Sequence, residues 1–121
     1  MRLFALRGAN SVAANEEDAI LDATDELMRE LMARNALTAE AMVSCIFTLT
    51  NDLDAQFPAV AARRLGLDHV PLLCAREIPV PGSLPSVIRV MVHYYAEEGT
   101  EPRHVYLGAA KALRRDLSSA Q

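Results

Sequence analysis

The chain has 121 residues, of which 51% are hydrophobic and 23% are charged, and its formal net charge is -4. This length and composition predict one globular domain over residues 1–121 with a single modest core. The negative charge argues against a general nucleic-acid-binding surface. No apolar run approaches the roughly 18 residues of a membrane span, and the first apolar run is too short for a signal peptide. We therefore expect a cytoplasmic protein that binds neither nucleic acid nor membranes.

Common motifs for metals, phosphates and nucleophilic catalysis are missing from the sequence. Its two cysteines, Cys45 and Cys74, are too few for a disulfide framework, and neither lies in a Cys-x-x-Cys or Cys/His cluster. Glycine-rich phosphate loops and a nucleophile elbow are absent as well. The three histidines are scattered, and we interpret them as structural. We expect no metal and no cofactor.

The first third of the chain predicts a strand followed by a long helix. Residues 2–7 alternate loosely between polar and apolar side chains and are followed by Gly8, so we expect a strand with Arg7 at its carboxyl end. Asn15, with three acidic residues after it, is typical of a helix start. Apolar residues then recur at helical spacing as far as Arg34 and predict a stripe that faces the core.

The middle of the chain predicts a buried strand between short helical segments. A helical turn is expected at residues 38–40 and a strand at residues 43–50, in which Cys45 alternates with other apolar side chains as a buried, inert thiol. The apolar residues that alternate with it are Val43, Phe47 and Leu49. Residues 57–66 predict a short helix, with a proline in the first turn and a glycine at the end.

Two apolar runs near the end of the chain each carry an ionisable side chain. Residues 70–78 contain Glu77 and residues 86–95 contain Arg89, and the proline- and glycine-rich segment between them must be a loop. Both charges are therefore expected on the sheet. An arginine in so apolar a strand is costly unless it is paired or faces a wet cleft, so Arg89 is a candidate functional residue.

The last elements are short. Residues 104–107 predict a fifth strand, residues 108–113 a helical turn, and residues 116–121 a flexible polar tail. The element order predicts an α/β (α+β) fold: a mixed five-stranded sheet with one long helix and short helices. One long helix cannot cover both faces of such a sheet, so the uncovered apolar face predicts that chains associate.

The candidate residues suggest chemistry without a covalent step. They are arginines at the ends of elements, one carboxylate, one cysteine and one tyrosine. Such a set can bind a small dianion and stabilise developing charge.

Several segments, in order along nearly the whole chain, resemble the AroH-class chorismate mutases. They are Arg7-Gly8-Ala9, residues 52–59, Val70-Pro71 with Cys74 and Glu77, Ile88-Arg89-Val90-Met91, and residues 103–107 followed by Leu113-Arg114. The resemblance implies a pseudo-barrel homotrimer with active sites in the clefts between subunits. It also implies that the substrate is chorismate, which rearranges to prephenate without a cofactor.

The resemblance assigns roles to the residues that match the family's site. Arg89 matches the cation that contacts the ether oxygen, and Glu77 matches the carboxylate that accepts the ring hydroxyl, with Cys74 as a nearby contact to the same hydroxyl. Arg7 and Tyr106 match the groups that hold the side-chain carboxylate.

Further matching positions line or close the cleft. Phe57, Ala59 and Leu72 match cleft-wall positions from the neighbouring chain. Arg63 matches a nearby cation, and Leu113 and Arg114 match the tail segment that closes over the ligand. Val60 and Leu73 depart from the pattern, standing where the family has a lysine and a threonine.

Two other functions are compatible with the residues. A Rid-type imine deaminase is another small trimeric enzyme that sets an arginine against a carboxylate, although it would lack the pattern from Tyr106 to Arg114. A non-enzymatic sensor of an aromatic-pathway acid could use the same cleft. Fold alone does not separate these functions, so the choice depends on the site residues.

Overall fold

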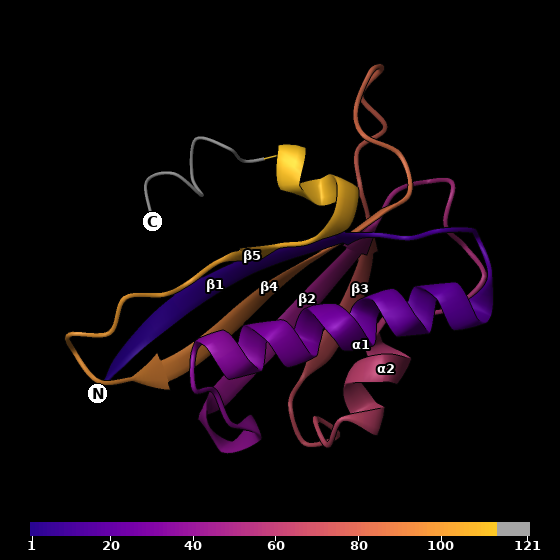
Figure 1. Ribbon diagram of the computed structural model, residues 1–121. Coiled ribbons are helices and arrows are strands. Elements are labelled where there is room, and N and C mark those ends of the chain that lie inside the picture. The colour runs from indigo at the N-terminus through magenta and orange to yellow at the C-terminus, as the bar shows by residue number, and fades with distance from the viewer. Residues whose placement is uncertain (114–121) are drawn as a thin grey trace.

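Five strands form one mixed sheet in the computed structural model of the chain, which describes residues 1–113 (Figure 1). The strands are β1 (Arg2–Ser11), β2 (Met42–Leu49), β3 (Leu72–Arg76), β4 (Val87–Ala96) and β5 (Val105–Tyr106). Their order across the sheet is β3-β2-β4-β1-β5. β4 pairs antiparallel with β1 and β2, whereas β3 and β5 run parallel to their neighbours. The predicted mixed five-stranded α/β fold is confirmed.

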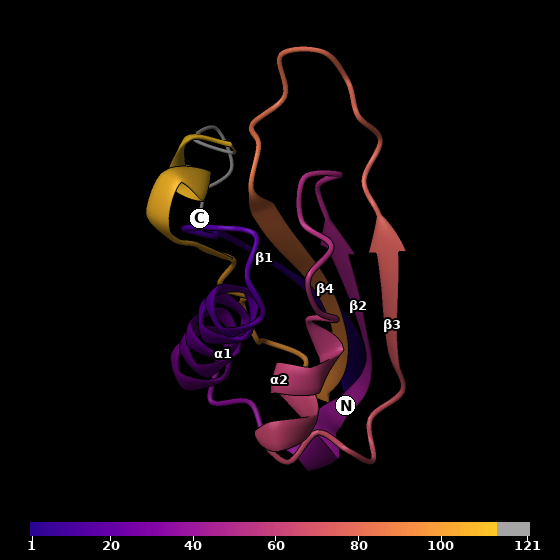
Figure 2. The same ribbon diagram turned by 90° about the vertical axis from the view of Figure 1, so that its right-hand side faces the viewer.

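Two α-helices, α1 (Glu17–Arg34) and α2 (Ala59–Arg64), lie on the same face of the sheet (Figures 1 and 2). Short 3-10 helices occupy Ala39–Ala41 (η1) and Gly108–Ala112 (η2), where helical turns were predicted. The predicted cap of α1 is wrong, because Glu16 occupies the N-cap and makes no side-chain cap hydrogen bond. Asn15 instead hydrogen-bonds the carboxylate of Asp54, at 2.7 Å, and so ties the start of α1 to the loop after β2.

The core fills the space between α1 and the sheet. Its largest fully buried side chains come from the apolar stripe of α1 and from alternate positions of β1, β2 and β4, and they include Leu6, Leu27, Leu31, Phe47, Val92 and Tyr94. Each buried large apolar side chain contributes about 1.5–3 kcal/mol relative to an exposed one. Gly8 lets the two layers come close, since a Cβ there would lie 3.0 Å from the side chains of Leu27 and Leu31.

The predicted alternation of β2 is correct except at its start. Cys45, Phe47 and Leu49 face the core, but Val43 is 39% exposed. A β-bulge between Met42 and Ser44 shifts the register there and turns Val43 away from the core. Burial raises the pKa of the Cys45 thiol to about 11, as expected of an inert cysteine.

Two of the strand boundaries that differ from the prediction change the position of a site residue. β1 continues through Gly8 to Ser11, so Arg7 lies within the strand rather than at its carboxyl end, because the ladder to β4 is unbroken there. β3 ends at Arg76, so Glu77 lies one residue beyond the strand. Its backbone N–H still donates to the Leu49 carbonyl oxygen at 3.0 Å, which holds Glu77 against the end of β2.

Within the part of the chain that the structure describes, the face of the sheet opposite α1 and α2 is open except where η2 packs on Ala9 and Val87. Exposed apolar side chains there include Leu3, Ile46, Leu73 and Tyr95. The uncovered apolar face is therefore confirmed, and the association of chains through it stays a prediction. Among residues 1–113, no helix combines the length and the apolar character needed to cross a membrane.

Candidate active site

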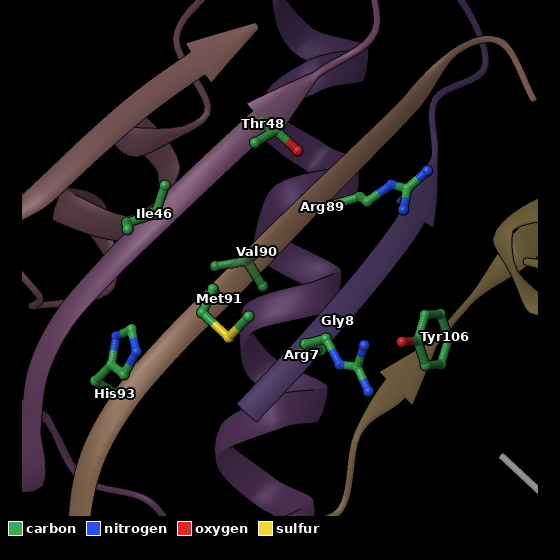
Figure 3. A pocket seen from close by; sticks show the side chains of 9 residues that line it. All are labelled: Arg7, Gly8, Ile46, Thr48, Arg89, Val90, Met91, His93 and Tyr106. Carbon is green, nitrogen blue, oxygen red and sulfur yellow. The ribbon is translucent and has the colours of Figure 1, made fainter. Parts of the chain in front are cut away.

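A cavity of about 490 Å³ opens on the uncovered face of the sheet. Figure 3 shows this face with α1 behind the strands. Four strands, β1, β2, β4 and β5, contribute the lining residues, which are Arg7, Gly8, Ile46, Thr48, Arg89, Val90, Met91, His93 and Tyr106. Three residues predicted as site residues, Arg7, Arg89 and Tyr106, thus line a single cavity.

Arg89, at the upper end of this cavity in Figure 3, forms an ion pair with Glu77, which itself lines a separate cavity with residues of the β3–β4 loop. The Nε atom of Arg89 lies 3.1 Å from Oε2 of Glu77. The Arg89 side chain is 46% exposed and that of Glu77 only 14%, so the carboxylate sits behind a guanidinium that reaches solvent. The hydroxyl of Thr48 donates a hydrogen bond of 2.7 Å to the same Oε2 atom. Because the cation is fixed but accessible, it can interact with an anionic group in the cavity.

Arg7 and Tyr106 occupy the side of the cavity formed by β1 and β5. Arg7 projects from β1 on the open face, and the Tyr106 hydroxyl is directed toward it (Figure 3). The backbone N–H of Arg7 donates to Nδ1 of His104 at 2.9 Å, and the next residues along the two strands are ladder partners. His104 thus has the structural role that we predicted, extending the β1–β5 pairing by one position. The cavity holds two arginines and one phenol, a suitable lining for a dianion.

Leu113, the last residue that the structure describes, packs on the same cluster as Tyr106. Both pack on a small buried cluster of Ala9, Val87 and Ala110. Gly108 starts η2 with a φ of 54°, and a Cβ at this position would clash with the Ser11 side chain. The glycine therefore lets η2 fold back over the end of β1. Arg114, the other tail residue predicted in the site, lies outside the described residues.

The remaining predicted residues are not brought to the Arg89 cavity within one chain. Cys74 pairs in register with Phe47, a core residue, and packs against the core on the helix-covered face. Phe57 is 65% exposed and lines a separate cavity with Cys74. Ala59 is buried in the core, and Leu72 packs against the core. Arg63 is exposed at the end of α2. A site that included all of them would need a second chain.

The matching family model is chorismate mutase type I, and it covers residues 3–117. The chain belongs to the chorismate mutase type I family. It is 48% identical to the chorismate mutase AroH of Thermus thermophilus over 118 residues, covering 96% of this chain and 97% of that protein. It is 38% identical to the chorismate mutase AroH of Bacillus subtilis over 120 residues, covering 98% of this chain and 94% of that protein.

A solved chorismate mutase from Clostridium thermocellum has the same fold. Its TM-score is 0.86 at 45% identity, with 89% of this chain and 97% of that chain covered. The resemblance found in the sequence and the chorismate mutase-like fold are both confirmed.

Sequence reasoning did not predict as site residues six of the nine residues that line the cavity, which are Gly8, Ile46, Thr48, Val90, Met91 and His93. Thr48 is the most informative of these because it hydrogen-bonds Glu77. A signal was available, since the alternation that sends Cys45 and Phe47 inward sends Thr48 outward. What the alternation does not show is that Thr48 stands directly opposite Arg89, a pairing set by the register between β2 and β4.

A hydrogen-bonded anchor holds both ends of the β3–β4 loop, which extends beyond the sheet in Figure 2. The carboxylate of Asp52 accepts the Ser86 N–H at 2.9 Å and the Ser86 hydroxyl at 2.8 Å. At the other end, Arg76 Nη1 donates to the carbonyl oxygen of Thr50 at 2.8 Å. Ser86 has a φ of 55°, so the anchor stabilises a conformation that serine rarely adopts. Glu77 is the first residue of this loop and directly follows Arg76.

Proposed function

We propose that the chain rearranges chorismate to prephenate in the cavity on the open face of the sheet, as a step in aromatic amino-acid biosynthesis. The observation that carries this proposal is the Arg89–Glu77 pair, in which a half-exposed cation that lines the cavity is held against a largely buried carboxylate. Family membership supplies the reaction. The pair supplies the electrostatic environment that the reaction needs.

The rearrangement is a pericyclic [3,3] shift, so it needs no nucleophile, no proton transfer and no cofactor. In its transition state the ether C–O bond breaks ahead of C–C bond formation. Negative charge therefore gathers on the ether oxygen and positive charge on the ring. Arg89 would face the ether oxygen as a preorganised cation, which is the arrangement that lowers such a barrier. Glu77 would accept the ring hydroxyl and face the cationic ring.

Substrate orientation is the second requirement, because free chorismate seldom adopts the diaxial conformer that reacts. We assign Arg7 and Tyr106 to the side-chain carboxylate. Both line the same cavity as Arg89 and lie below it in Figure 3, on separate strands. Binding the substrate at both ends would hold it in a near-attack geometry and remove entropy from the barrier.

The complete site, in this proposal, forms between chains of a homotrimer. The exposed apolar residues on the open face support association, as does the position of Phe57 and Cys74 away from Arg89. The neighbouring chain would supply Phe57, Ala59 and Leu72 as cleft wall, with Arg63 as a nearby cation. Leu113 and Arg114 would close over the ligand.

Association can be tested by light scattering during size-exclusion chromatography. We expect three times the mass of one chain. Leu73→Glu, which puts a charge on the open face where Leu73 is 62% exposed, should lower that mass. Val80→Glu is the matched control, since Val80 is 58% exposed in the β3–β4 loop. A trimer that Leu73→Glu leaves intact would contradict the use of this face.

We also place the protein in the cytoplasm. The two cysteines are free thiols in the structure, which suits a reducing compartment.

The activity is tested by following chorismate by ultraviolet absorbance with purified protein and no added metal or cofactor, while prephenate is identified by NMR. Saturable conversion to prephenate is the expected result. Binding of chorismate without turnover would favour the sensor instead. If the protein neither converts nor binds chorismate, the proposal is overturned. Turnover of an imine with release of ammonia would favour the deaminase.

A further inference from the structure

The carboxylate of Glu77 uses its two oxygens differently. The hydrogen bond from Thr48, at 2.7 Å, and the closest approach of Arg89, at 3.1 Å, both fall on Oε2. Neither of these two contacts involves Oε1. Arg89 makes its closest approach to this carboxylate through Nε rather than through a terminal nitrogen of its guanidinium.

An arginine and a carboxylate left to themselves favour a bidentate pair with two parallel N–H···O contacts. In such a pair, both carboxylate oxygens would accept hydrogen bonds from the guanidinium, and one of its terminal nitrogens would be used as a donor. It would also draw the guanidinium away from the cavity. The Thr48 hydrogen bond opposes this rearrangement, because rotating the carboxylate to present both oxygens would break a contact to a charged acceptor.

Thr48 is well placed for this task. It lies on β2, where its register partner on β4 is Arg89 and its partner on β3 is Ala75, two residues before Glu77. Its side chain is half-buried, and its β-branched shape restricts χ1 in a strand. The hydroxyl is thus fixed by a rigid element between the two charged residues.

We propose that Thr48 is a positioning residue that holds Glu77 through Oε2, so that Oε1 and the terminal nitrogens of Arg89 stay available to the substrate. This inference rests on the proposed function. It concerns a residue that acts through Glu77 rather than one that takes part in the bond rearrangement.

Steady-state kinetics of Thr48→Val and Thr48→Ser test the proposal. Valine keeps the shape of threonine but removes the hydroxyl, so kcat should fall about tenfold, the cost of one hydrogen bond to a charged group, while KM changes much less. Serine keeps the hydroxyl and should restore most of kcat. The melting temperature should stay near that of the unaltered protein in both variants. Thr38→Val makes the same change at an exposed residue with no side-chain cap hydrogen bond and should leave kcat unchanged.

A double-mutant cycle shows whether Thr48 acts through Glu77. In a Glu77→Ala background, Thr48→Val should cost nothing further, because the group that it positions is gone. The inference is overturned if Thr48→Val keeps full kcat, if Thr48→Ser fails to recover activity, or if the two substitutions simply multiply. No turnover of chorismate by the unaltered chain would overturn the proposed function itself, which separates the two failures.

Discussion

The two faces of the sheet use neighbouring residues of the same strands for opposite purposes. On β4, Ile88 is fully buried in the core, whereas the adjacent Arg89 lines the cavity on the other side. On β2, Phe47 is fully buried, and Thr48 hydrogen-bonds Glu77 on the open face. The covered face finds its apolar partners within the chain, while the open face keeps its charges accessible. We therefore expect substitutions at adjacent residues of one strand to affect different properties, with those on the covered face lowering stability and those on the open face lowering activity.

Phe47→Ala breaks the covered face and carries the largest expected effect on stability. Replacing a fully buried phenylalanine should lower the free energy of unfolding by about 3–5 kcal/mol, measured by urea denaturation. Val43→Ala in the same strand is the control, because Val43 is turned outward by the bulge and should cost far less. Equal losses in the two variants would contradict the assignment of faces.

Tyr94→Phe sharpens the comparison from inside the covered face. The Tyr94 hydroxyl is buried and finds no hydrogen-bond partner among the residues that the structure describes, and burial raises the pKa of this phenol. Removing an unpaired buried hydroxyl should leave the protein as stable or stabilise it by about 1 kcal/mol. A clear destabilisation in thermal or urea unfolding would mean that the hydroxyl has a partner, such as a buried water.

Asp52→Asn probes the exposed anchor at the end of the sheet, where the expected effect is smallest. The hydrogen bond from the Thr50 hydroxyl, followed by those from Ser86, lowers the pKa of Asp52 below its usual 3.8, against an opposing effect of desolvation. A lowered pKa in the folded state means that the carboxylate stabilises the fold above pH 3.8, and that this contribution is lost as the pH falls through the folded pKa.

Urea midpoints at neutral pH and near pH 3 should therefore differ between the unaltered protein and Asp52→Asn. The variant should be less stable at neutral pH, and the gap should narrow on acidification. A gap that stays constant with pH would show that the charge of Asp52 does not contribute.

Much of the fold followed from local patterns. The stripe of α1 and the alternation of β2 were predictable because each depends on the period of a helix or a strand. The errors lie where one residue overrides the pattern. Glycine at position 8 suggested a strand end, yet its lack of a Cβ is what lets α1 pack on the continuing strand. The bulge beside Val43 left no sequence signal at all.

The site was predictable only in part, because its contacts are made across strands. Arg89 drew attention as a charge in an apolar strand, but Thr48 became visible only once the register placed it opposite Arg89. Arg7 and Tyr106 were identified through resemblance, and their common cavity depends on the pairing of β1 with β5. Local sequence fixes which face a residue occupies, whereas strand order fixes its neighbours.

The most direct test of the central claim compares kcat/KM for chorismate in Arg89→Ala and Arg29→Ala. Arg29 is an exposed arginine of α1 that forms an ion pair with Asp25, one helical turn away. Its replacement by alanine removes the same charge as Arg89→Ala does, at a residue outside the cavity. We predict a loss of about 100- to 1,000-fold for Arg89→Ala, the usual cost of one preorganised electrostatic donor, with the fold intact. Arg29→Ala should keep the activity of the unaltered protein. Equal activity in the two variants would contradict the claim that Arg89 stabilises the transition state.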